Sequence, residues 1–103
     1  MTVNLAPESG TAGTEFKVEV SGYIAYEPIS IELIQPDPCG SVIEKREART
    51  MPDGYIRQSF TVLPVSPLPR DFNPCLYGVY KVVFTTADKG VLKINLTVLE
   101  HAS

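Results

Sequence analysis

A chain of 103 residues with 44% hydrophobic and 20% charged residues fits one folded domain built on a single core. Its net charge is −3 and its basic residues form no cluster outside the mixed run at 44–47, so it lacks the basic face that nucleic-acid binding requires. Its apolar runs are only a few residues long, so none of them could insert into a membrane.

Alternation of apolar and polar residues predicts β-strands along most of the chain. Successive side chains of a strand point to opposite faces, so a period of two indicates a strand with one buried face. In chain order, strands are expected around Val3 and Leu5 and at 15–21, 29–33, 55–63, 79–86 and 92–98. Glycine- and proline-containing turns separate these segments, and no segment of useful length has the period of a helix.

The apolar positions of these strands are predicted to form the core between two sheets. They are Phe16, Val18, Val20, Ile29, Ile31, Leu33, Phe60, Val62, Tyr80, Val82, Phe84, Leu92, Ile94, Leu96 and Val98. The intervening polar positions are predicted to be exposed: Lys17, Glu19, Glu32, Lys81, Lys93 and Thr97.

Segment 41–49 is compatible with two structures. Ser41 precedes Glu44 by three residues, the spacing of a helical capping box, and good helix formers follow. A helix of this length is marginal, however, and a sandwich needs a strand at this position. We predict a strand and keep a short helix as the alternative. The proline-rich segment 64–74 is expected to be an extended connection.

Four stretches of the sequence resemble a known family. Residues 7–10 and 13–23 combine a Gly-Thr turn with an alternating strand that ends in Ser-Gly-Tyr, and residues 53–64 and 77–82 provide a Gly-Tyr turn and a Gly-x-Tyr strand start. These features resemble the immunoglobulin-like repeats of prokaryotic surface and secreted proteins. Unlike antibody domains, the chain contains no Trp, and neither cysteine lies within the strands that carry the antibody core disulfide.

The resemblance implies an immunoglobulin-like antiparallel β-sandwich of about seven strands in two sheets over residues 1–99. Residues 100–103 are treated as a tail, part of which is attributed to vector sequence. The implied function is that of a non-enzymatic structural or adhesive module, which spaces, displays or docks the neighbouring domains of a larger protein. The alternative is an accessory carbohydrate-binding domain of a secreted polysaccharide-active enzyme.

An extracellular or cell-surface location follows from this interpretation. The first residues contain neither a basic nor an apolar signal segment, so we expect the chain to be a fragment of an exported protein. The expected partners are neighbouring domains and, beyond them, a protein or glycan ligand. Nucleic acid and membrane insertion are not expected.

Cys39 and Cys75 are predicted to form a disulfide. In a sandwich of this topology the third and sixth strands are antiparallel neighbours, so the two cysteines meet at the same end of the sheet. Zinc binding would need further ligands, and the sequence has no Cys-x-x-Cys motif or histidine cluster. The alternative is a pair of unpaired cysteines in a reducing compartment.

Catalytic and metal-binding residues are not apparent in the sequence. The one histidine, His101, lies in the tail, and the loop carboxylates Asp37 and Asp71 are typical turn formers. We therefore predict no enzyme activity, no cofactor and no metal site. A calcium site at Asp37 and Asp71 is the alternative for metal binding, but their spacing does not match a calcium-binding loop.

Tyr23 and Tyr26 are the candidate binding residues. Both lie between the second and third predicted strands, where exposed tyrosines could contact a protein or stack on a sugar ring. The resemblance implies instead that Tyr23, the aromatic residue after Ser-Gly, covers the end of the core, and we favour this structural role over binding. Asn95 begins a glycosylation sequon and is expected to point outward, and Tyr80 could form a tyrosine corner.

Overall fold

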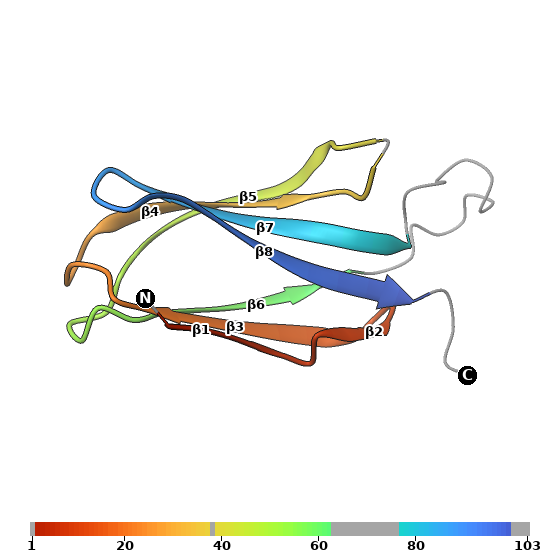
Figure 1. The fold of residues 1–103 in the computed structure, drawn as a ribbon, viewed down its shortest axis with the longest axis horizontal. Coiled ribbons are helices and arrows are strands. Elements are labelled where there is room, and N and C mark those ends of the chain that lie inside the picture. Colours follow the sequence, from red (N-terminus) through yellow and green to blue (C-terminus); the bar gives the residue numbers. More distant parts are fainter. Residues whose placement is uncertain (1, 38, 63–76, 100–103) are drawn as a thin grey trace.

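The computed structural model describes residues 2–37, 39–62 and 77–99, which form two stacked β-sheets (Figure 1). One sheet has three strands in the order β1 (Thr2–Ala6), β3 (Glu15–Ser21) and β6 (Ile56–Thr61). The other has five strands in the order β2 (Ser9–Thr11), β8 (Gly90–Leu99), β7 (Gly78–Thr86), β4 (Pro28–Ile34) and β5 (Val42–Arg49). The described residues contain no helix, so the predicted all-β class is confirmed.

The sequence predicted about seven strands, and the described residues form eight, because a short strand, β2, lies between the first two predicted strands. β1 pairs with β3 in the three-stranded sheet. After Pro7, the chain crosses to the other sheet, where β2 runs parallel to β8. All the other strand pairs are antiparallel. The continuous chain from β1 to β2 therefore links the two sheets along one lateral edge of the sandwich.

The predicted core lies between the two sheets. All the predicted core residues are buried except Leu92, which is partly buried and packs against the others. Tyr23 and Ile56 also belong to the core. Of the predicted exposed positions, Lys17 and Lys93 are exposed, whereas Glu19, Glu32, Lys81 and Thr97 are half-buried. Neighbouring side chains along the outer sheet surfaces cover part of these four residues, which is common for long polar side chains.

Segment 42–49 is the strand β5, so the alternative of a short helix is wrong. Its pairing with β4 sets Glu44, Arg46 and Ala48 opposite the buried residues of β4. The Arg46 guanidinium lies 4.4 Å from the centroid of the Phe60 ring and donates a 2.9 Å hydrogen bond to Gln58 Oε1. Arg46 also pairs with Glu44. These contacts join β5 to β6 across the second lateral edge, and they explain why the polar residue Gln58 interrupts the apolar face of β6.

The molecule is elongated, with principal extents of 44 × 25 × 19 Å. Thr2 pairs with Ser21 at one end of the long axis, and Leu99 pairs with Thr11 at the other. The described chain therefore begins and finishes at opposite ends of the sandwich (Figure 1). The predictions for the proline-rich segment 64–74 and the tail 100–103 lie outside the described residues.

Candidate functional site

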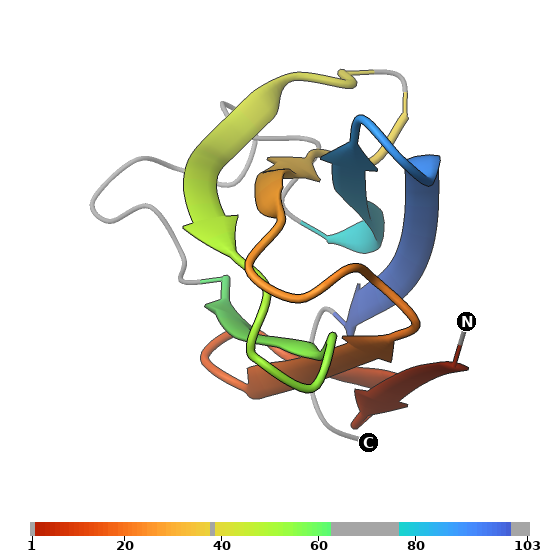
Figure 2. The same cartoon turned by 90° about the vertical axis from the view of Figure 1, so that its left-hand side faces the viewer.

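Two connections meet at the end of the sandwich where β1 begins. Residues 22–27 join β3 to β4, and residues 50–55 join β5 to β6. Seen along the long axis, the 22–27 loop crosses the end of the sandwich and the 50–55 turn lies beside it (Figure 2). The residues predicted to bind a ligand, Tyr23 and Tyr26, both lie in this loop.

Backbone and hydroxyl hydrogen bonds hold the two connections together. The Tyr23 N–H donates to Gly54 O at 3.2 Å, and the Thr50 N–H donates to Glu27 O at 2.9 Å. The Thr50 hydroxyl accepts a 2.8 Å hydrogen bond from the Glu27 N–H and donates to Ile24 O. Because Thr50 is only 2% exposed, these hydrogen bonds are shielded from water. The loop is therefore fixed at several points along its length.

Gly54 allows the two connections to approach this closely. Its φ is +78°, and a Cβ at this position would lie 2.4 Å from the Tyr23 carbonyl oxygen. Any other residue would face both a disfavoured backbone conformation and a clash with main-chain atoms. Gly54 is thus the position at which the turn and the loop contact each other directly.

Tyr23 is part of the core. Its side chain is 6% exposed, as expected from the interpretation in which it covers the end of the core. The Tyr23 hydroxyl is buried and has no hydrogen-bond partner among the residues that the structure describes. Burial, and secondarily the nearby Glu27 carboxylate, raise the pKa of Tyr23 above its ordinary value. Its ring offers no free face on which a ligand could stack.

Tyr26 is on the surface, with 61% of its area exposed. Its φ of 60° makes it the only residue other than glycine with a positive φ in the described part of the chain. The Tyr26 carbonyl accepts a 3.0 Å hydrogen bond from Arg49 Nη1. Ile24, 55% exposed, is its apolar neighbour in the loop. Ile24 and Tyr26 together are called the loop knob below.

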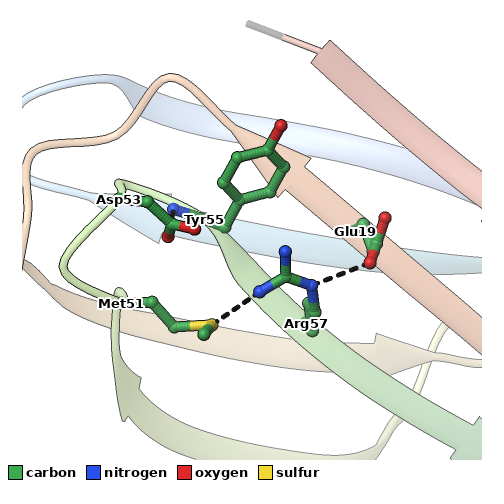
Figure 3. A network of polar contacts seen from close by, with 5 residues as sticks. All are labelled: Glu19, Met51, Asp53, Tyr55 and Arg57. Carbon is green, nitrogen blue, oxygen red and sulfur yellow. Dashed lines mark hydrogen bonds and ion pairs between the residues drawn. The ribbon is translucent and has the colours of Figure 1, made fainter.

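A polar network fastens the 50–55 turn to the outer surface of the three-stranded sheet (Figure 3). Arg57 donates from Nε to Glu19 at 2.8 Å and from Nη1 to the Met51 sulfur at 2.8 Å. The guanidinium also lies 4.7 Å from the centroid of the Tyr55 ring. Asp53 Oδ1 accepts a 3.1 Å hydrogen bond from the Tyr55 N–H. Partly exposed pairs of this kind add little stability, so their main effect is to set the position of the turn.

The opposite end of the molecule has a hollow of about 370 Å³. Its lining consists of Pro36, Asp37, Tyr77, Gly78, Val79 and Lys81, and it is called the Gly78 hollow below. Gly78 has a φ of +132°, and a Cβ there would lie 3.1 Å from Pro36 Cβ. The absence of a side chain at Gly78 therefore allows Pro36 to pack against the start of β7.

A second hollow, of about 350 Å³, lies at the same end as the loop knob. β4 pairs with β7 only from Ser30 and Thr85 onward, so the two strands separate beyond these residues. The lining of the hollow between them includes Pro28, Glu47 and Ala87, and it is called the Pro28 hollow below. It contains no histidine or cysteine and only one carboxylate among its lining residues.

The structure locates only some of the other residues singled out in the sequence. Cys39 lies in the turn after β4, where its N–H donates to Pro36 O at 3.1 Å, and no described cysteine is a free thiol. Cys75 and Asp71 lie outside the described residues, so the Cys39–Cys75 disulfide stays a prediction. Asn95 is exposed on β8. Tyr80 is buried, which raises its pKa, and its predicted tyrosine corner stays untested.

Chemical sites are not apparent in the described ranges. Residues 2–37, 39–62 and 77–99 contain no group of three or more His, Cys, Asp or Glu side chains that could hold a metal ion. The same ranges include no helix long and apolar enough to cross a membrane. The candidate for contact with another molecule is thus the loop knob, which is both exposed and held in place by hydrogen bonds. Sequence reasoning identified Tyr26 but missed Ile24, although an aliphatic residue outside the alternating segments was a usable signal.

Comparison with known proteins gives a fold but no family. No protein-family model and no curated protein matches the chain. The structure resembles macromomycin over 95% of this chain and 98% of that one, with 10% sequence identity and a TM-score of 0.61. At this identity the similarity supports the two-sheet all-β fold alone.

Two further structures align with this chain, both of a β-glucosidase from Listeria innocua. The structure with isofagomine has 12% identity and a TM-score of 0.46, and the one with glucose has 14% identity and a TM-score of 0.45. Each alignment covers 94% of this chain but only 16% of the β-glucosidase.

Proposed function

We propose that the chain is an immunoglobulin-like, non-enzymatic module that spaces and docks neighbouring domains of an exported protein. The order of the strands supports the immunoglobulin-like assignment. The last strand, β8, lies beside β7, followed by β4 and β5, while β1, β3 and β6 form the other sheet. Immunoglobulin-like sandwiches arrange the corresponding strands in this way.

The positions of Thr2 and Leu99 carry the spacing function. They lie at opposite ends of a sandwich whose longest extent is 44 Å. A domain with this geometry adds its full length to a chain of domains, whereas one whose termini lie together branches from the side of the chain. A spacer and a side-branching domain should therefore give linked copies of different overall length.

A covalent cross-link fits the same proposal. The Cys39–Cys75 disulfide would tie the turn after β4 to the connection before β7, and such a bond persists in the oxidising surroundings of an exported protein. The alternative of a carbohydrate-binding domain has less support, because one of the two candidate tyrosines, Tyr23, belongs to the core, which leaves Tyr26 as the exposed one of the pair.

Small-angle X-ray scattering of two linked copies tests the spacing function. Two copies joined from Leu99 to Thr2 should have a maximum dimension near twice that of one copy. A maximum dimension close to that of a single copy would contradict the proposal, because the copies would then lie side by side. Turnover on ester or glycoside substrates, or retention by an insoluble polysaccharide, would instead favour an enzyme or a carbohydrate-binding domain.

A further inference from the structure

We propose that tandem copies of this fold dock end to end, with the loop knob of one copy seated in the Gly78 hollow of the preceding copy. This inference rests on the proposed spacing function and names the contact that would orient successive modules. The occupant of the hollow is thus a second copy of this chain.

The loop knob has the properties of a displayed contact. Hydrogen bonds to Thr50, Gly54 and Arg49 fix the loop, yet Ile24 and Tyr26 stay 55% and 61% exposed. The left-handed backbone of Tyr26 is unfavourable for a bulky residue. Hydrogen bonds to Tyr26 O, to Ile24 O and from the Glu27 N–H hold this backbone in place, while most of the ring stays exposed. Backbone strain that the surrounding structure holds in place is found most often at functional sites, so we read it here as support for a contact.

The Gly78 hollow has a size and chemistry that suit the loop knob. The exposed Val79 and the half-buried Tyr77 supply most of the apolar surface, while Pro36 is largely buried. Asp37 and Lys81 supply groups that could bind the Tyr26 hydroxyl. Its volume of about 370 Å³ falls in the range of pockets that enclose small organic groups. An aromatic ring with a polar tip is therefore a fitting occupant.

The position of these two features produces a head-to-tail contact. The loop knob belongs to the loop that follows Ser21, the partner of Thr2, so it lies at the end where a preceding copy would be attached. The Gly78 hollow lies at the other end, where Gly78 pairs with Val98 near the finish of β8. Two different surfaces that meet in this way generate an open row of copies instead of a closed dimer. An open row is the arrangement that a spacer requires.

The small size of the contact predicts that it is weak between separate molecules. A tyrosine buries about 150–250 Å², whereas a stable interface needs about 1,000 Å² or more. Separate chains should therefore associate only at millimolar concentrations. A short linker raises the local concentration of the neighbouring copy to about this level, so the contact would form within a tandem chain.

Nuclear magnetic resonance of the single chain tests the contact. Amide signals are followed by ¹H–¹⁵N correlation spectra while the protein concentration rises from about 0.05 to about 5 mM, the range in which the contact should form. We expect signals of Ile24 and Tyr26 to shift together with those of Gly78 and Val79. Tyr26→Asn, which tolerates the left-handed backbone, should weaken the association by about tenfold or more. Val91→Ser is the matched control, since Val91 is 59% exposed but lies outside the loop.

Three results would overturn the proposal. One is the absence of concentration-dependent shifts, and another is an association that Tyr26→Asn leaves unchanged. The third is coupled shifts at the loop knob and at Ser30 and Thr85, which would indicate a two-fold dimer through the Pro28 hollow. None of these results bears on the length of two linked copies, so failure of the docking contact and failure of the spacing function can be told apart.

Discussion

Tyr23 and Tyr26 are three residues apart in one loop but have opposite surroundings. Tyr23 packs in the core with 6% of its area exposed, and its N–H is bonded to Gly54. Tyr26 is 61% exposed and has a left-handed backbone. The inner half of the loop is therefore placed to stabilise the fold. The exposed side chains of Ile24 and Tyr26 lie where another molecule can reach them, so we expect them to contribute little to stability.

This contrast separates the loop's structural role from its proposed docking role. The hydrogen bonds of Thr50 act on backbone atoms of Ile24 and Glu27, so they fix the loop without involving the exposed side chains. Substitutions in the inner half should consequently change the free energy of unfolding. Substitutions of the exposed residues Ile24 and Tyr26 should weaken association without lowering the free energy of unfolding.

Replacing Tyr23 by Asn should have the largest effect. The substitution removes a buried aromatic ring and leaves a polar group in the core, so the free energy of unfolding should fall by about 3–5 kcal/mol. Urea denaturation followed by circular dichroism measures this change. A loss below about 1 kcal/mol would show that Tyr23 does not hold the end of the core.

Gly54→Ala should have the next largest effect. The new Cβ would lie 2.4 Å from Tyr23 O in a backbone conformation with positive φ, so we expect a loss of about 2–3 kcal/mol in unfolding free energy. Gly90→Ala is the matched control, because its φ is +73° but no atom lies within 4 Å of the added Cβ. Equal losses at the two positions would refute close packing of the turn against the loop.

The pH dependence of stability tests the environment of the Tyr23 hydroxyl. Burial and Glu27 raise the pKa of Tyr23, so above pH ~10 the unfolded chain loses a proton that the folded chain retains. Stability should therefore fall as the pH rises through this range. Tyr23→Phe should make the decline shallower, and at neutral pH it should alter the unfolding free energy by less than about 1 kcal/mol. An unchanged alkaline decline would argue against the raised pKa.

Alternation in the sequence was sufficient to predict the strands and most of the core. It succeeded because each strand has one face against the other sheet, as in Phe16, Val18 and Val20 of β3. It was weakest at β5, which is the last strand of its sheet. There the charged residue Arg46 faces the other sheet, and the residues around it are typical of a helix. The pairing of Arg46 with Gln58 and Phe60 depends on two distant strands, which no local pattern reports.

The candidate site was predictable only in part. The sequence placed Tyr23 and Tyr26 in one loop, and the family resemblance pointed to a core role for Tyr23, but local pattern alone did not fix how either ring is exposed. Their exposure depends on Gly54 and Thr50, which are more than 20 residues away and determine which side of the loop faces the core. The left-handed backbone of Tyr26 is likewise a product of tertiary packing, since tyrosine itself does not favour it.

The unfolding free energy of Tyr26→Asn tests the contrast between the two tyrosines most directly. Asn tolerates the left-handed backbone, and the hydrogen bond from Arg49 reaches the Tyr26 carbonyl, which the substitution retains. The account predicts a free energy of unfolding that is unchanged or higher by up to about 1 kcal/mol, beside the large loss expected for the same substitution at Tyr23. A loss of more than about 1 kcal/mol for Tyr26→Asn would contradict it, because the exposed tyrosine would then be a structural residue.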